Sequence, residues 1–500
     1  MVTLDDYLND IVEKGDDGSN ILRAITAPTL RNCKYVDILK DAVGNNFPVL
    51  RIPEDYYVVV HSVSGNVNEI DPGIHAATMI NNLVAQAQKI GAEPIALADV
   101  VDSNSGNLDI IKYIGDSMID AANFHNLAIM NGENAILGER INPEYKANVS
   151  GTMISLIKKD KLADLVAFDE IPDDLPGVYC FKSGTTYGIF DPEGKAVAIN
   201  SDGIGTKTEF YERLVKHVLG LEDSLAMKED DSIKAGATVK VVSDVVETNG
   251  NIPIHDLIQR ATELGKEQTI LYALQHEQVG ERIHGYNKDA SVYNVSGSAV
   301  CTIDEKFLEN PPKPAEGEFL IAIKGKPNPR SNGITDRRKL MVEHFGENWH
   351  KNPNAKEYAE FLSTPSSILY PLFREAMNQG LATSVYHMSG GAFKGKLAAP
   401  LAKHGLFCRV ENSFEPHKID LELQKLQQAP NEVAYAKWPM GTDGFITTND
   451  VNSAIKLIES YGFEARKVSV LEKTNKTGVE LEGIKDSNGN NLYYSGIKEK

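Results

Sequence analysis

The most constraining feature of this 500-residue chain is that part of it is repeated. Residues 91–104 resemble residues 236–249, which begin 145 positions later, and both stretches open on Gly-Ala and close on Asn. Two shorter blocks follow in the same order in each copy: residues 138–141 recur at 280–283, and residues 148–151 recur at 294–297. Because chance rarely places three matches in one order at such similar spacing, we interpret the chain as a tandem repeat of one structural module.

Each copy of the module is expected to alternate strands with helices. In the first copy, apolar runs predict strands at residues 56–60, 94–98, 127–130 and 151–157. Longer stretches with helical periodicity predict helices at about 73–90 and 108–124. The second copy repeats this order from about residue 187 to residue 303. Mixed elements of this kind indicate an α/β or α+β fold class built in layers.

A third region without the repeat follows a proline-rich linker at residues 309–317. It is expected to open with a strand at 318–323 and to close with strand, helix and strand at 444–447, 451–461 and 465–470. We therefore predict a first module at residues 1–165, a second module at 170–308, a carboxyl-terminal domain at 318–480 and a polar tail at 485–500. Several domains suit a length that one hydrophobic core rarely serves.

Charge and composition exclude several functional classes. A net charge of −19 lacks the basic footprint that a nucleic acid or an anionic membrane surface requires. No apolar run approaches the roughly 20 residues of a membrane span, and the acidic start of the chain lacks the pattern of a secretory signal. The four cysteines are scattered without metal-ligand spacing, as expected of a reduced protein in the cytoplasm.

The segment Asp202-Gly203-Ile204-Gly205-Thr206-Lys207 has the ingredients of a polyphosphate site and follows a predicted strand at 196–199. The Asp202 carboxylate suits a divalent cation, and Lys207 supplies a positive charge. Gly203 and Gly205 allow the backbone to approach phosphate oxygens closely. An ordinary Asp-Gly turn with a solvated lysine has the same composition, so this segment alone does not decide between the two interpretations.

Taken together, the motifs resemble those of the aminoimidazole ribonucleotide synthetase (phosphoribosylformylglycinamidine cyclo-ligase) family. Residues 202–207 are similar to its signature, and residues 91–94 and 131–135 are similar to its Gly-Ala-Glu-Pro turn and Gly-Gly-Glu-Thr-Ala loop. In the third region, residues 331–333, 387–391 and 440–441 are similar to its Ser-Asn-Gly, His-Ile-Thr-Gly-Gly and Met-Gly segments. The resemblance covers most of the chain and implies two tandem amino-terminal modules followed by one carboxyl-terminal domain of this family.

The two modules have diverged in complementary ways. The family normally carries one such module per chain and pairs two chains through it, so two modules in one chain imply an internal pseudo-dimer. The second module keeps Asp202 and Asp231 at positions where the family binds metal, whereas the first has Val63 and Gln86 there. The first module instead keeps Glu133 of the Gly-Glu loop. We expect one nucleotide site, centred on the second module. Glu133 either completes this site from the first module or is a vestige without a role in it.

The resemblance implies ATP and Mg²⁺ as cofactors. Asp202 and Asp231 would hold the metal ion, with Asp230 as a further ligand. Lys207 would neutralise the phosphates, with Gly203, Gly205 and Thr206 beside them. The acidic run at residues 229–231 equally suits a solvated helix segment. Lys182 begins a Lys-Ser-Gly-Thr-Thr segment that is a candidate for a second phosphate contact, although loops of this composition are common.

Candidates for substrate binding lie in the third region. Lys324, Lys326 and Arg330 form a basic cluster ahead of Ser331-Asn332-Gly333, and such a cluster suits a 5′-phosphate. A basic loop that balances nearby acids would have the same sequence.

His387 stands close to the pair Gly390 and Gly391. It either touches substrate and transfers a proton or is a hydrogen-bonding residue of a turn. The glycine pair indicates a close backbone approach to a ligand or a tight turn.

The resemblance implies an ATP-dependent ligase of purine biosynthesis. Such an enzyme converts formylglycinamidine ribonucleotide to aminoimidazole ribonucleotide and releases ADP and phosphate. A nucleotide-binding homologue without catalysis, or a related ATP-dependent enzyme with another substrate, remains an alternative because the first module has diverged. The expected partner is a phosphorylated small molecule. Whether the chain acts as a monomer or as a further homodimer stays open.

Overall fold

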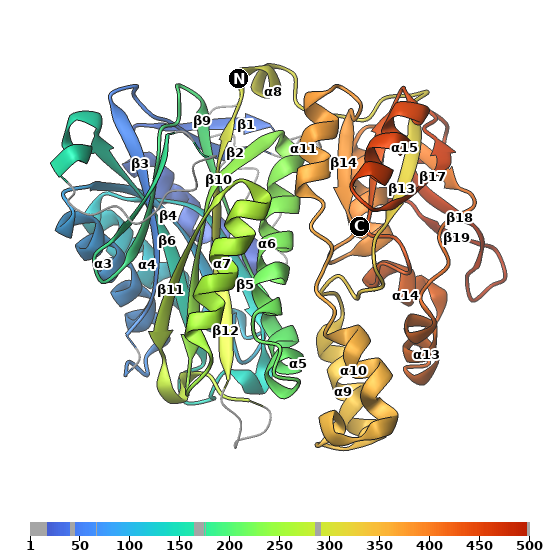
Figure 1. Cartoon of the computed structure of the whole chain (residues 1–500), viewed down its shortest axis with the longest axis horizontal. Coiled ribbons are helices and arrows are strands. Elements are labelled where there is room, and N and C mark those ends of the chain that lie inside the picture. The colour runs from blue at the N-terminus through green and yellow to red at the C-terminus, as the bar shows by residue number, and fades with distance from the viewer. Residues whose placement is uncertain are drawn as a thin grey trace. The chain divides into compact units, whose positions relative to one another are not determined.

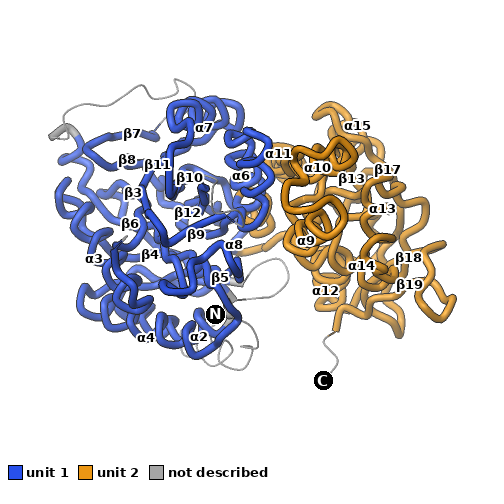
Figure 2. The backbone as a smooth tube through the Cα atoms, turned by 90° about the horizontal axis from the view of Figure 1, so that it is seen from below, with its two compact units in different colours: residues 1–39, 46–228, 237–308 blue, residues 40–45, 229–236, 309–500 orange. Residues whose placement is uncertain are grey.

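The structure is a computed structural model that describes residues 18–40, 46–66, 68–164, 175, 177–285 and 292–497. The chain forms two compact units (Figure 2). Unit 1 comprises residues 1–39, 46–228 and 237–308, and unit 2 comprises residues 40–45, 229–236 and 309–500. Both copies of the repeat therefore lie in unit 1, except for a short piece of the second copy that is counted with unit 2. Among the described residues, no helix is long and apolar enough to cross a membrane.

Unit 1 contains two six-stranded sheets of the same design (Figure 1). The strand order is β5-β4-β6-β3-β8-β7 in one sheet and β11-β10-β12-β9-β2-β1 in the other. The strands of the first sheet are β3 (Tyr56–Ser64), β4 (Glu93–Ser103), β5 (Ala128–Ile136), β6 (Ala147–Lys158), β7 (Val178–Lys182) and β8 (Thr186–Phe190). Those of the second are β1 (Val36–Lys40), β2 (Asn46–Arg51), β9 (Ala196–Gly203), β10 (Ala237–Thr248), β11 (Leu271–Gln278) and β12 (Tyr293–Ile303).

Helices complete the two modules of unit 1. They are α2 (Gly18–Thr26), α3 (Pro72–Lys89), α4 (Leu108–His125), α5 (Thr208–Arg213), α6 (Leu219–Ser232), α7 (Ile254–Gln268) and α8 (Glu305–Glu309). Helix α4 crosses between the parallel strands β4 and β5, and α7 does the same between β10 and β11. Side chains such as Val60 and Ala98 from one sheet and Val241 and Val300 from the other share one buried core. The predicted mixed α/β fold class is confirmed.

The two modules exchange their first two strands. β1 and β2 precede the first module in the sequence, but β2 pairs with β9 of the second module, where Leu50 lies opposite Val197. β7 and β8 precede the second module, but β8 pairs with β3 of the first, where Val59 lies opposite Ile189. This exchange joins both repeats into one body. The boundary predicted between residues 165 and 170 lies outside the described residues.

Unit 2 is built on two smaller sheets. A four-stranded antiparallel sheet has the order β14-β16-β13-β17, and a three-stranded sheet has the order β15-β18-β19. The strands are β13 (Phe319–Lys324), β14 (Ser384–His387), β15 (Phe407–Val410), β16 (Gly444–Thr448), β17 (Glu464–Val470), β18 (Gly478–Lys485) and β19 (Asn491–Tyr494). The helices are α9 (Ile334–Phe345), α10 (Lys356–Leu362), α11 (Tyr370–Asn378), α12 (Ala399–Lys403), α13 (Lys418–Leu426), α14 (Asn431–Lys437) and α15 (Val451–Ser460).

The segment expected to be a polar tail from residue 485 contributes to the core of unit 2. Strand β19 pairs antiparallel with β18, where Tyr494 lies opposite Val479. The side chains of Leu492 and Tyr494 are buried. Alternation of polar and apolar residues in the last strand thus secures it against the sheet.

The repeated Gly-Ala pair has a conformational cause. Gly91 follows α3 with φ 73°, and Gly236 follows the short helical turn after α6 with φ 74°. Glycine adopts this left-handed conformation without the steric penalty of a Cβ atom, which is why helices often end on it. In each module the chain turns at this glycine and enters a central strand, β4 or β10.

The two modules meet around an approximate two-fold arrangement of repeated residues. Ile141 and Ile283, which are equivalent in the repeat, form an isolated β-bridge. The hydroxyls of the equivalent residues Ser150 and Ser296 lie 2.7 Å apart. The predicted internal pseudo-dimer is therefore present within unit 1.

A buried ion pair also ties the modules together. The Arg140 guanidinium of the first module lies 2.8 Å from the Glu212 carboxylate of the second, with side chains only 2% and 3% exposed. Arg140 also donates to the Tyr293 carbonyl, and the Tyr293 amide donates to Glu212. Removing one member would leave the other charge buried without compensation.

We predict that Arg140→Met lowers the free energy of unfolding by about 3–5 kcal/mol, because Glu212 would keep an uncompensated buried charge. The midpoint of thermal unfolding measures the loss. Arg51→Met is the matched control: its pair with Glu305 is 37% and 60% exposed and 2.9 Å long. An exposed pair contributes about 0–1 kcal/mol. Equal shifts in the two variants would contradict the prediction.

Candidate functional site

The motif at residues 202–207 lies at the end of strand β9. Asp202 is half-buried, lies opposite Gly297 of β12 and accepts a hydrogen bond of 2.7 Å from the Gly203 amide. Gly205 has φ 53° and opens a single 3₁₀ turn that runs to Lys207. The segment follows a strand, as predicted, and the chain passes through this turn into α5.

Lys207 has a partner within unit 1. Its ammonium lies 2.7 Å from the Asp223 carboxylate, and neither side chain is exposed to solvent. Asp223 also accepts a hydrogen bond from the Tyr211 hydroxyl. Thr206 is buried as well. That Lys207 neutralises phosphate stays a prediction, and this geometry gives its charge a different partner.

Two other predicted contact residues occupy opposite parts of the first sheet. Lys182 is exposed and closes β7 at the tight hairpin to β8, where it pairs with Thr186. Glu133 is half-buried on β5, and its carboxylate lies 3.7 Å from the Arg23 guanidinium. The segment that begins at Lys182 is thus a β-hairpin turn.

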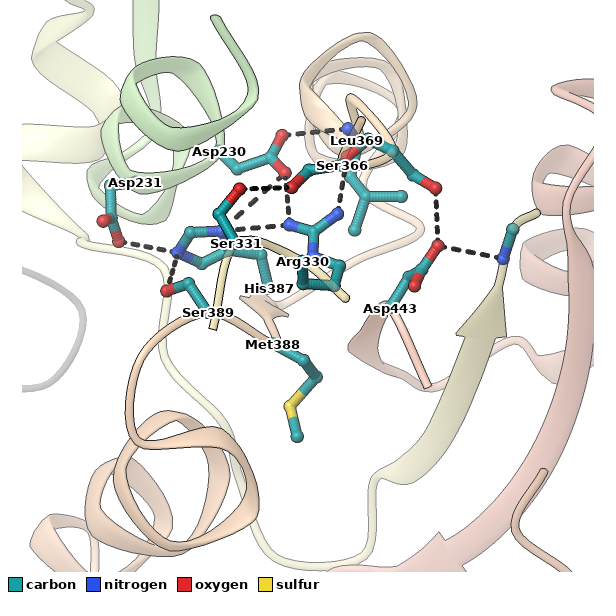
Figure 3. A network of polar contacts seen from close by, with 12 residues as sticks. Asp230, Asp231, Arg330, Ser331, Ser366, Leu369, His387, Met388, Ser389 and Asp443 are labelled. Atoms are coloured by element: carbon teal, nitrogen blue, oxygen red, sulfur yellow. Dashed lines mark hydrogen bonds and ion pairs between the residues drawn. The ribbon is translucent and has the colours of Figure 1, made fainter. Parts of the chain in front are cut away.

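In unit 2 the structure brings together residues from distant parts of the sequence (Figure 3). Arg330 is fully buried and adopts a left-handed backbone with φ 50°, as does Ser331 with φ 54°. Its guanidinium lies 3.0 Å from the Asp230 carboxylate and donates to the Ser367 carbonyl at 2.5 Å. Strain of this kind at two adjacent non-glycine residues marks a loop whose shape is imposed by its contacts.

The Ser331-Asn332-Gly333 loop is tied to the loop after β14. The Asn332 side-chain amide donates to the Met388 carbonyl at 3.1 Å, and the Ser331 hydroxyl lies 3.3 Å from that of Ser366. Gly333 has φ 61°, and a Cβ there would lie 2.3 Å from the Trp438 ring nitrogen. Gly390 faces open space apart from Asn332, and Gly391 packs against Gly395. Both loops are therefore shaped by glycine.

The His387 ring lies between the Arg330 guanidinium and the Asp231 carboxylate. Its Nδ1 lies 3.3 Å from Nη2 of Arg330, and its Nε2 lies 2.9 Å from the Asp231 carboxylate. Because arginine only donates, Nδ1 must accept, and the ring proton is then on Nε2 and is donated to Asp231. Burial lowers the pKa of His387 well below its usual range. The ring is therefore a neutral link with both nitrogens occupied.

Asp230 and Asp231 have protein cations as partners. Asp230 is fully buried, contacts Arg330 and accepts from the Leu369 amide at 2.9 Å. Burial raises the pKa of Asp230 to about 6, although Arg330 opposes this. Asp231 contacts Lys234, and Lys396 lies 3.5 Å away. Burial opposes ionisation of Asp231, but the two lysines hold its pKa well below the usual range.

These contacts bear on the predicted metal ligands. Cationic side chains that already neutralise a carboxylate repel a metal ion that would approach it. Among the residues that the structure describes, no group of three or more His, Cys, Asp or Glu side chains is placed to hold a metal ion. The metal role of Asp230 and Asp231 stays a prediction, which this arrangement does not support.

The basic cluster expected at residues 324–330 is divided in the structure. Lys324 and Lys326 line a cavity of about 210 Å³ in unit 2, together with Asn328, His417 and other residues. Arg330 does not line this cavity and is buried in the network around His387. The cavity is smaller than the roughly 300–1,000 Å³ of a typical ligand pocket.

Two site residues were missed by sequence reasoning. Lys234 follows Asp231 by one helical turn, a spacing that favours an ion pair and could have revealed it. Lys396 belongs to a π-helical segment, Phe393–Ala398, in which no pattern marks it.

Comparison with known proteins identifies the relatives of the chain. Residues 44–156 match the family described as AIR synthase related protein, N-terminal domain. The resemblance to the AIR synthetase family is confirmed. Curated relatives include phosphoribosylformylglycinamidine cyclo-ligases. That of Staphylococcus aureus (strain Newman) is 24% identical over 291 residues, which cover 57% of this chain and 82% of the relative. That of Staphylococcus epidermidis is 24% identical over 308 residues, which cover 60% and 87%.

Solved structures show a more distant similarity. Escherichia coli HypE, a hydrogenase maturation protein, has a TM-score of 0.39 and 14% identity over 61% of this chain and 87% of its own. Thermotoga maritima PurL complexed with AMPPCP has a TM-score of 0.36 and 12% identity over 57% of this chain. The chain spans only 41% of that PurL chain.

The two AIR synthase-like modules treat one equivalent aspartate differently. In the second module, Asp244 contacts the buried Lys228 ammonium and accepts from Tyr272 at 2.7 Å. In the first module, the position of Lys228 is taken by the buried Leu83. Asp99, the equivalent of Asp244, is 1% exposed, and neither of its carboxylate oxygens has a hydrogen-bond partner among the described residues. Burial raises the pKa of Asp99 to about 8, although Arg23 opposes this.

The buried Asp99 carboxyl, unpaired among the described residues, predicts that the stability of the folded protein depends on pH. Asp99 keeps its proton in the folded protein up to about pH 8 and loses it near pH 4 when unfolded, so the folded state is favoured at low pH. The contribution of Asp99 to the free energy of unfolding falls by about 1.4 kcal/mol per pH unit as the pH rises from about 4 to about 8. Asp99→Asn should remove this slope, as measured by denaturant unfolding from pH 5 to pH 8.5. Asp116→Asn, on the exposed face of α4, should keep it. Parallel slopes for Asp99→Asn and the unmodified protein would contradict the assignment.

Proposed function

We propose that this protein is an ATP-dependent ligase that converts formylglycinamidine ribonucleotide to aminoimidazole ribonucleotide, with release of ADP and phosphate. The observation that carries the proposal is the similarity to cyclo-ligases over 82% of the S. aureus enzyme. The order of the motifs supports it, because residues 202–207, 331–333 and 387–391 fall in the same sequence as in that family. More broadly, we propose that the protein is an ATP-using enzyme related to AIR synthase.

The reaction needs activation of one oxygen. Transfer of the γ-phosphoryl group of ATP to the formyl oxygen creates a phosphate leaving group. The neighbouring nitrogen then attacks the activated carbon, the carbon–oxygen bond breaks, and phosphate departs as the imidazole ring closes. Protein assistance to such a reaction consists mainly of positioning and charge neutralisation.

The residues predicted to hold Mg²⁺ fit that ion unequally. Asp202 fits, because it is a half-buried carboxylate at the end of a strand. A carboxylate oxygen is a ligand that Mg²⁺ prefers. Asp230 and Asp231 do not fit, because Arg330, Lys234 and Lys396 already neutralise them. Mg²⁺ at Asp202 would neutralise phosphate charge.

Neutral His387 and its loop would position a substrate rather than exchange protons with it. Both ring nitrogens are occupied by Arg330 and Asp231. The rigid loops at residues 331–333 and 389–391 are linked through Asn332. This arrangement favours a fixed surface for a ligand.

A second candidate function is nucleotide binding without catalysis. The observation that favours it is the use of lysines as counter-ions: Lys228 at Asp244, Lys207 at Asp223, and Lys234 at Asp231. A lysine in such a position replaces the charge that a metal ion would bring. A regulatory homologue would keep nucleotide affinity and lose turnover.

We predict that the purified protein, given formylglycinamidine ribonucleotide and Mg-ATP, releases ADP and aminoimidazole ribonucleotide. Asp202→Ala should lower kcat by at least about 100-fold, as expected when a group that stabilises transferring charge is removed. Asp116→Ala, an exposed carboxylate of α4, is the matched control and should keep full activity. Turnover that survives Asp202→Ala unchanged would contradict the site assignment.

Calorimetry separates the two candidate functions. An enzyme should bind Mg-ATP and show ADP release that depends on substrate. Saturable Mg-ATP binding that Asp202→Asn weakens, with no turnover of any purine intermediate, would favour the regulatory homologue.

A further inference from the structure

Two lysines meet at one carboxylate on unit 2. Lys234 lies within the short 3₁₀ turn Ile233–Ala235 that follows α6, and Lys396 comes from the π-helical segment Phe393–Ala398. Both ammonium groups approach Oδ1 of Asp231, that of Lys396 to 3.5 Å. The side chains of Lys234, Lys396 and Asp231 are 27%, 26% and 27% exposed. The cluster therefore reaches solvent, unlike the fully buried Arg330–Asp230 pair beside it.

Charge within this cluster is not balanced. Asp231 supplies one negative charge against the two ammonium groups. Asp230 does not make up the difference, because its carboxylate is fully buried and contacts Arg330. His387 contributes no negative charge and donates its own ring proton to Asp231. Burial lowers the pKa of Lys234 to about 8, and the nearby Lys396 lowers it further while Asp231 opposes both.

Glycines lie next to Lys396 and in the loop that precedes it. Gly395 precedes Lys396 and lies against Gly391, whose own Cβ would come within 3.1 Å of the Gly395 Cα atom. Gly390 is exposed, and a Cβ there would meet only Asn332 Oδ1 at 3.8 Å. A Cβ at Gly395 would itself meet only the Gly390 carbonyl oxygen, at 3.8 Å.

We propose that Lys234 and Lys396 form a binding site for a small tetrahedral oxyanion, either inorganic phosphate or the phosphoryl group of a larger molecule. Ammonium groups bind phosphate as point charges, and two of them with one shared counter-ion have capacity for a further anion. Asp231 is then the internal competitor of the ligand. Phosphate binding at this site does not depend on the proposed ligase activity, because it requires no turnover.

The test is a calorimetric titration of the full chain with inorganic phosphate at pH 7, without nucleotide or metal. The unmodified protein should show saturable binding. Lys234→Gln and Lys396→Gln should each weaken it about tenfold, the effect of removing one charge-assisted contact. Lys394→Gln is the matched control, because Lys394 lies on the same segment and is exposed. It should leave the affinity unchanged.

Asp231→Asn distinguishes this site from a metal site. Asparagine keeps the shape and can still accept from His387, but it removes the competing negative charge. Phosphate affinity should therefore rise about tenfold, whereas a metal ligand would show no such gain. Circular dichroism and thermal unfolding establish that each variant is folded.

A non-hydrolysable ATP analogue distinguishes the two sources of the anion. Displacement of phosphate by the analogue, sensitive to Lys396→Gln, would support a nucleotide phosphoryl group at this site. Simultaneous binding would support a separate phosphate. Absence of saturable phosphate binding in the unmodified protein, or equal affinity in folded Lys396→Gln, would overturn the proposal.

Discussion

The structure depends on how each buried acid is compensated. A carboxylate removed from water must find a cation or keep a proton, because burial of an uncompensated charge is costly. Asp223 is paired with Lys207, Asp244 with Lys228, and Asp230 with Arg330. Asp99 forms no ion pair among the described residues, and burial raises its pKa to about 8 although Arg23 opposes this. The same requirement decides which acids are available to a ligand.

The need to neutralise buried carboxylates also explains how the two repeats differ although they share one fold. Both keep the glycine that ends a helix and the strand order of the sheet. Their buried polar residues have changed: Leu83 stands where the second module has Lys228. The first module can therefore serve as a scaffold that completes the paired sheets. The match to the AIR synthase family falls on this first module, whereas the Asp202 motif belongs to the second.

Local sequence patterns predicted individual elements well. The helix expected at 73–90 is α3 (Pro72–Lys89), and the strand expected at 465–470 is β17 (Glu464–Val470). Apolar periodicity reports which face of an element is buried, and that is a local property. The exchange of β1 and β2 for β7 and β8 was not predicted, because strand partners are chosen by contacts distant in sequence. The Arg330–Asp230 and Lys396–Asp231 contacts, which join residues 100 or more positions apart, were missed for the same reason.

We propose that Asp231 serves as a counter-ion of Lys234 and Lys396 rather than as a metal ligand. Titration of the nucleotide-free protein with Mn²⁺, followed by electron paramagnetic resonance, tests it most directly. We predict that Asp231→Asn leaves Mn²⁺ binding unchanged and that Asp202→Asn abolishes it. Mn²⁺ binding that weakens tenfold or more in folded Asp231→Asn would contradict the account.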